Sequence, residues 1–72
     1  MATGMENRLR ALRLERGMTQ QELALRARTT PALLTWVERY GYLPGPELQE
    51  RIARALDVTP EDIWPLEVRD EG

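Results

Sequence analysis

Arginine is the residue type in this chain that is best suited to binding an anion. All ten basic residues are arginines and none is lysine. The planar guanidinium can hold a phosphate or a carboxylate through two parallel hydrogen bonds. A biased genomic base composition would produce the same preference, so the arginines indicate anion binding without establishing it.

The charges are unevenly distributed along the chain. Residues 1–40 hold seven arginines against four glutamates, a net charge of +3, whereas residues 41–72 hold three arginines against eight acids, a net charge of −5. The basic half could face an anion while the acidic half keeps the protein in solution. Ordinary unevenness of composition is the other explanation, and the sequence leaves both open.

The composition excludes several catalytic and metal-binding chemistries. The chain has no cysteine and no histidine, so it cannot form a Cys/His zinc cluster or a nucleophile activated by histidine. The pairs Glu47/Glu50 and Glu61/Asp62 fall in the expected first turns of helices, which explains them without catalysis. We therefore expect a protein that is not an enzyme and that uses no metal or cofactor.

The length indicates one small domain. A chain of 72 residues buries only about 60% of its unfolded surface. No apolar run exceeds three residues, so no segment is expected to span or bind a membrane. The absence of cysteine fits a reducing compartment, and the expected location is the cytoplasm.

The first three expected elements are short helices with recognisable ends. The first should run from about residue 6 to 16, with Met5, Leu9 and Leu12 inward, and stop at Gly17. The second, about 20–27, opens with the capping box Thr19–Glu22. The third, about 31–39, opens with a threonine cap and a proline, and a glycine at position 41 ends it.

Two further helices are expected after the turn at residues 42–46. A helix that begins at Pro46 should turn Leu48, Ile52, Ala55 and Leu56 inward. A short helix follows the cap and proline at residues 59–60, and Ile63 and Trp64 should close the core. No stretch alternates with the period of a strand.

The helices expected at 20–27 and 31–39, joined by a turn of three residues, form a helix-turn-helix. The sequence here resembles the Cro/phage-repressor (XRE) type of helix-turn-helix domain, and Gly-x-Thr-Gln-x-Glu-Leu-Ala is its most specific segment. The matching residues are Arg8-Leu9, Leu12-Arg13, Gly17–Ala24, Leu34, Val37-Glu38-Arg39, Pro44, Ile52–Leu56, Val58–Glu61 and Ile63.

This resemblance implies a fold and a function. The fold would be all-α, a compact five-helix helix-turn-helix domain of the lambda-repressor-like type over residues 6–65, followed by an acidic tail at 66–72. The function would be that of a sequence-specific transcriptional regulator that binds double-stranded DNA, which members of the family usually do as homodimers. The helix at 31–39 would read the major groove.

The resemblance also implies which residues act. Gln20 would touch a DNA phosphate, and the alternative is that it is a solvated residue of the first turn. Arg13 and Glu38 would form a structural ion pair between the first and third helices. The residues expected to face DNA are Thr19, Gln20, Arg28, Thr29, Thr30, Ala32, Leu33, Thr35, Trp36 and Arg39.

The expected outer face of the helix at 31–39 departs from the family because it is largely apolar. Only Thr35 and Arg39 are polar there, and Ala32 and Leu33 could touch thymine methyl groups. The alternative is a protein-interaction module that uses Ala32, Leu33, Trp36 and Tyr40, with DNA binding weak or lost. A third possibility is that Trp36 packs against residues 42–43 as part of the core. Both tyrosines, at 40 and 42, are expected to be half-buried.

At two positions this sequence has a side chain where the backbone is expected to adopt a left-handed conformation. The family commonly has glycine where Arg28 and Asp57 stand. An arginine in a left-handed conformation is strained by about 1 kcal/mol or more, so either Arg28 is strained or the turn has a different shape. Aspartate tolerates this conformation better.

Overall fold

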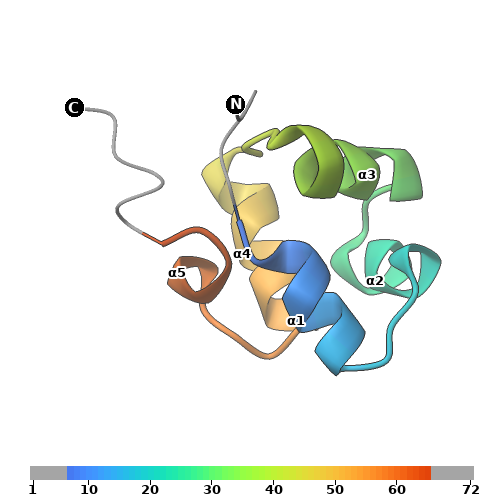
Figure 1. Ribbon diagram of the computed structural model, residues 1–72. Helices are drawn as coiled ribbons and strands as arrows, with labels where there is room; N and C mark the ends of the chain where they lie inside the picture. The colour runs from blue at the N-terminus through green and yellow to red at the C-terminus, as the bar shows by residue number, and fades with distance from the viewer. Residues whose placement is uncertain (1–6, 66–72) are drawn as a thin grey trace.

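The computed structural model describes residues 7–65, and five helices follow one another there. They are α1 (Leu9–Glu15), α2 (Gln20–Ala27), α3 (Pro31–Tyr40), α4 (Pro46–Ala55) and α5 (Pro60–Ile63). Figure 1 shows α1 in front, α4 behind it, α3 along the top, α2 at the right and α5 at the left. No strand occurs within residues 7–65, which confirms the all-α fold. The expected tail at 66–72, Met5 and Glu6 lie outside the described residues.

The boundaries of α2 and α3 follow from their caps. The Thr19 hydroxyl accepts the Glu22 N–H, and the Glu22 carboxylate accepts the Thr19 N–H, each at 3.0 Å, so the predicted capping box is confirmed. The Thr30 hydroxyl accepts the Leu33 N–H at the start of α3. Gly41 ends α3 in the left-handed region, with φ 73°.

The start of α1 differs from the expected one. The helix begins at Leu9, and the Asn7 side-chain oxygen accepts the Leu9 N–H at 3.0 Å. The Asn7 amide nitrogen donates to the Val37 carbonyl of α3 at 3.0 Å. One side chain therefore caps α1 and ties it to α3, and this fixes the boundary by a contact between distant residues.

The core is made by one apolar face of each helix. α2 packs mainly against α4 and α3. Leu48 and Ala55 lie at the edge of the core rather than inside it, whereas Gln49 is buried and donates to the Pro44 carbonyl at 2.8 Å. The buried apolar residues are Leu9, Leu12, Leu23, Ala24, Ala27, Leu34, Val37, Ile52, Ala53, Leu56, Ile63 and Trp64.

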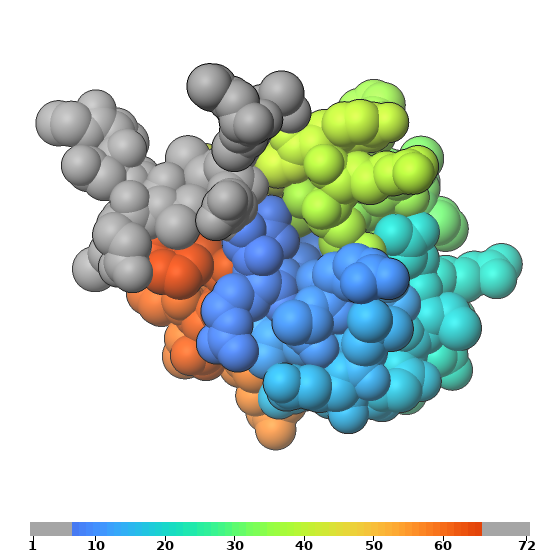
Figure 2. All heavy atoms as spheres, in the orientation of Figure 1, coloured from blue at the N-terminus to red at the C-terminus, as the bar shows by residue number. Residues whose placement is uncertain are grey.

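The packing leaves α3 at one edge of the molecule. In the space-filling view of Figure 2, α3 (yellow-green) forms the upper right edge, with α1 (blue) below it and α2 (cyan) at the side. None of the helices in residues 7–65 has the length and hydrophobicity that crossing a membrane requires.

Candidate nucleic-acid interface

The turn between α2 and α3 holds Arg28 in the left-handed conformation, with φ 59° and ψ 51°. The idea of a differently shaped turn is therefore wrong. The Thr29 N–H donates to the Ala24 carbonyl at 2.9 Å, and Arg51 Nε donates to the Ala27 carbonyl at 2.9 Å. These bonds fix the backbone on both sides of Arg28 and hold it in a conformation that arginine rarely adopts. Asp57 is left-handed as well, with φ 61°.

The ion pair between Arg13 of α1 and Glu38 of α3 is confirmed. Arg13 Nε donates to Glu38 Oε2 at 2.8 Å, and Nη2 donates to Oε1 at 3.1 Å. The side chains are only 9% and 2% exposed. Arg13 Nη1 also donates to the Met18 carbonyl at 2.7 Å. This bidentate pair therefore joins α1, the loop before α2, and α3 in a buried position.

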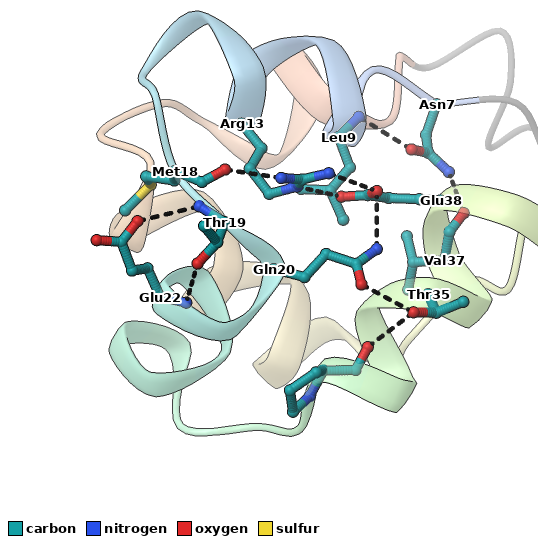
Figure 3. A network of polar contacts seen from close by, with 11 residues as sticks. Asn7, Leu9, Arg13, Met18, Thr19, Gln20, Glu22, Thr35, Val37 and Glu38 are labelled. Carbon is teal, nitrogen blue, oxygen red and sulfur yellow. Dashed lines mark hydrogen bonds and ion pairs between the residues drawn. The ribbon is translucent and has the colours of Figure 1, made fainter.

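Gln20, the first residue of α2, extends this pair into a network. Its Nε2 donates to Glu38 Oε1 at 3.1 Å, and its Oε1 accepts from the Thr35 hydroxyl at 3.0 Å. Figure 3 shows Gln20 lying between Glu38 and Thr35, with Arg13 on the far side of the carboxylate. The side chain is half-buried, so the description of Gln20 as a solvated residue is wrong, and its contact with a DNA phosphate stays a prediction.

The network also restricts what Thr35 can offer to a base. Its hydroxyl lies 3.0 Å from Gln20 Oε1 and 3.1 Å from the Pro31 carbonyl, and it donates its one proton toward these oxygens. The hydroxyl oxygen keeps its capacity to accept. Thr35 is therefore positioned to accept a hydrogen bond from a base rather than to donate one.

The outer face of α3 carries exposed aromatic rings. Trp36 is 54% exposed and Tyr40 is 58% exposed, so the interpretation of Trp36 as a core residue is wrong. Trp36 meets Tyr42 edge to face, with ring centroids 6.3 Å apart and planes at 76°, and Tyr42 is 46% exposed. Both tyrosines are therefore more exposed than expected, and they lie on either side of Gly41, which ends α3.

The other residues predicted to face DNA lie in several parts of the structure. Ala32 and Arg39 are exposed on α3, and Leu33 is half-buried there. Thr19 and Thr30 cap the two helices at their N-terminal ends. Thr29 is half-buried in the turn. The Arg28 side chain lines a hollow between α2 and α4, to which no residue of α3 contributes.

Three contributions to this site were missed in the sequence. Asn7 donates to the Val37 carbonyl of α3, and the Met18 carbonyl accepts from Arg13. Tyr42 extends the aromatic surface. Asn7 precedes a helical pattern, and an asparagine there is a recognisable capping signal. Nothing in the sequence indicates the contact between Trp36 and Tyr42.

Comparisons with known proteins agree with this geometry. A family model described as a helix-turn-helix domain matches residues 7–65. An uncharacterised HTH-type transcriptional regulator of Archaeoglobus fulgidus is 33% identical over 60 residues, which cover 83% of this chain and 86% of that protein.

Two solved structures are similar as well. The clp gene regulator ClgR of Corynebacterium glutamicum has 33% identity and a TM-score of 0.69, with 75% of this chain and 57% of ClgR covered, so this chain spans little more than half of ClgR. C.Esp1396I bound to a 25 base pair operator site has 29% identity and a TM-score of 0.66, with 71% and 67% covered.

The family model and the Archaeoglobus relative show that this chain belongs to the helix-turn-helix domain family. The capped α2, the turn of three residues and the exposed α3 are the parts that give the family its name. The family resemblance stated from the sequence is thereby confirmed.

Proposed function

We propose that this protein is a transcriptional regulator that binds duplex DNA and acts by binding rather than by catalysis. The observation that carries this proposal is the network of Arg13, Glu38, Gln20 and Thr35, which holds α2 and the exposed α3 in one fixed arrangement. A recognition helix needs such support because its side chains must meet base edges in a fixed register. The operator-bound relative C.Esp1396I supports the same function.

The N-terminal end of α2 is the proposed contact with the DNA backbone. Its first N–H groups have no partner inside the helix, and the helix dipole makes this end positive. The Thr19 cap and Gln20 lie at this end, next to the network that orients α3. A phosphate placed here would set the register of α3 in the major groove.

The outer face of α3 is the proposed contact with bases. Thr35 can accept a hydrogen bond there, and Ala32 and Trp36 offer apolar surface to thymine methyl groups. Arg39 is the exposed cation of this helix and would contact a phosphate. We expect a preferred site in which thymine methyl groups contribute strongly to recognition.

A homodimer and a cytoplasmic location are part of the proposal. Helix-turn-helix proteins that bind as two-fold dimers read half-sites one helical turn apart. A regulator also acts in the compartment that holds the DNA. Two half-sites about 10 base pairs apart in selected DNA would support the dimer.

The test is a salt series of binding to a duplex selected from a random pool and to a scrambled duplex. Arg39→Ala should weaken binding to both duplexes and reduce the slope of log K against log salt by about one unit. Arg10→Ala is the matched control, because Arg10 is an exposed arginine of α1 and belongs to neither α2 nor α3. Its slope should equal that of the unchanged protein.

Two outcomes would overturn the proposal. One is binding that is weak and equal for the selected and scrambled duplexes. The other is association with protein through Trp36 and Tyr40 with no selected duplex at all, which would favour the protein-interaction alternative. The helix-turn-helix relatives do not favour that alternative.

A further inference from the structure

A hollow of about 450 Å³ lies between α2 and α4. Four of the five residues that line it are arginines, namely Arg26 and Arg28 from the end of α2 and Arg51 and Arg54 from α4, with Ala55 as the fifth. No residue of α3 takes part. The proposed DNA contacts at the start of α2 and on α3 therefore leave this hollow without an assigned function.

Half of the arginines around the hollow have no ion pair with a described residue, and the other two have exposed partners. The side chains of Arg26 and Arg28 form no ion pair with any residue between 7 and 65. Arg51 lies 4.0 Å from Glu47, and Arg54 lies 3.6 Å from Glu50. Both carboxylates are exposed, and exposed pairs of this kind are weak. An anion in the hollow could displace them at little cost.

Part of this arrangement is held in place by the fold. Arg51 Nε donates to the Ala27 carbonyl at 2.9 Å, so its guanidinium is fixed against the end of α2. A smaller hollow of about 240 Å³ shares Arg26 and Ala55 with the first, and its lining adds Arg16 and one carboxylate, that of Asp57. Arg16 Nε donates to the Leu56 carbonyl at 2.7 Å. Five arginines therefore follow one surface, two of them anchored to backbone carbonyls.

The chemistry of the lining selects a class of ligand. Guanidinium groups bind phosphate oxygens in pairs, and a hollow of about 450 Å³ exceeds what one phosphate group fills. The lining contains no aromatic ring and no amide or hydroxyl side chain, so its polar side chains are all cationic hydrogen-bond donors, which suit an anion. We propose that the arginine-lined hollow between α2 and α4 is a second anion site, which binds a small ligand with several linked phosphate groups.

The test is a titration of the full-length, isotope-labelled protein with inorganic triphosphate, followed by amide chemical shifts. Saturable shifts should appear at residues 26–28 and 51–55 and not on α3. Arg26→Gln with Arg54→Gln should weaken binding by about tenfold or more, because two charge-assisted contacts are lost. Neither side chain bonds to the backbone of residues 7–65, so the fold should persist. The single variants give the same test if the double variant unfolds.

The control is Arg10→Gln, an exposed arginine of α1 that lines neither hollow, and it should change the affinity by less than about twofold. Orthophosphate at equal ionic strength should bind about tenfold more weakly than triphosphate. Equal affinity for the two anions, equal weakening in the control, or shifts confined to α3 would overturn the proposal. Shifts at the hollow with random duplex DNA but not with triphosphate would also overturn it and would point to a nucleic-acid backbone.

Discussion

Glu38 illustrates how a single residue can hold the reading surface in place. Its carboxylate is almost fully buried and accepts hydrogen bonds from Arg13 Nε, Arg13 Nη2 and Gln20 Nε2. A charge in this position is tolerated because all of these donors are present. The same carboxylate connects α1, α2 and α3. A substitution of Glu38 would therefore affect both the stability of the fold and the orientation of α3.

We predict that Glu38→Ala destabilises the protein by about 3–5 kcal/mol, the usual cost of leaving one partner of a buried pair alone. Urea unfolding measures this directly. Glu15→Ala is the control, because the Glu15–Arg16 pair is 3.6 Å long and exposed, and it should cost less than about 1 kcal/mol. Similar midpoints for the two variants would show that the Glu38 pair is not effectively buried.

A substitution of Arg28 is expected to stabilise the protein rather than destabilise it. Because its φ of 59° lies in the left-handed region, Arg28→Gly should stabilise the protein by about 1 kcal/mol. The melting temperature should rise by roughly 4–8 °C for each kcal/mol gained. The same substitution two residues earlier, Arg26→Gly, falls inside α2 and should cost about 1 kcal/mol. A decrease in both melting temperatures would contradict the strain at Arg28.

Among the elements, α5 depends most clearly on its cap. It has only four residues, and Thr59 and Asp62 form a capping box in which each side chain meets the backbone N–H of the other. Its last residue, Ile63, and the following Trp64 are fully buried. The cap therefore positions two core residues, and its loss should weaken the packing of the core.

The cap makes the stability of α5 depend on pH. Hydrogen bonds from the Thr59 backbone N–H and, secondly, from its hydroxyl lower the pKa of Asp62 below its ordinary value of 3.8. Since the folded state holds this proton less tightly than the unfolded state, the carboxylate stabilises the fold above pH 3.8 and loses that effect as the pH falls through the lowered pKa.

We predict that Asp62→Ala reduces stability at neutral pH and that the difference from the unchanged protein shrinks below pH 3.8. Chemical unfolding at a series of pH values, followed by tryptophan fluorescence, measures that difference. Glu50→Ala, which removes an exposed carboxylate outside any cap, should show no such convergence. A constant difference for Asp62→Ala across the series would contradict the assigned cause.

At the scale of the whole molecule, apolar and basic surfaces lie on different sides. The aromatic rings of Trp36, Tyr40 and Tyr42 belong to α3 and the loop after it, whereas the unneutralised arginines lie between α2 and α4. Exposed apolar patches in small proteins commonly mark contact sites. The low net charge of −2 is therefore an average over a molecule that has an apolar surface on α3 and a basic surface between α2 and α4.

We predict that Trp36→Ala leaves the stability within about 1 kcal/mol of the unchanged protein, because the ring is 54% exposed. If the ring meets bases, affinity for the selected duplex should fall more than affinity for a scrambled one. Fluorescence anisotropy with the two duplexes measures this difference. An equal loss on both would show that Trp36 contributes to affinity and not to recognition.

Local signals in the sequence determined the elements of this fold. The capping box of Thr19 and Glu22, Pro31 at the start of α3 and Gly41 at its end placed the two central helices almost to the residue. These signals depend on contacts within a few residues, which a sequence displays directly. The family resemblance added the Arg13–Glu38 pair, which joins residues 25 positions apart.

Only the tertiary structure decided which residues surround the polar side chains of these helices. Gln20 was predicted to contact a DNA phosphate, and the packing of α2 against α3 places its amide between Glu38 and Thr35. Arg28 looked like a DNA contact, and its left-handed backbone directs it toward α4. In both cases residues of another helix surround the side chain. The relative placement of helices depends on the whole core, so no local pattern of residues reveals it.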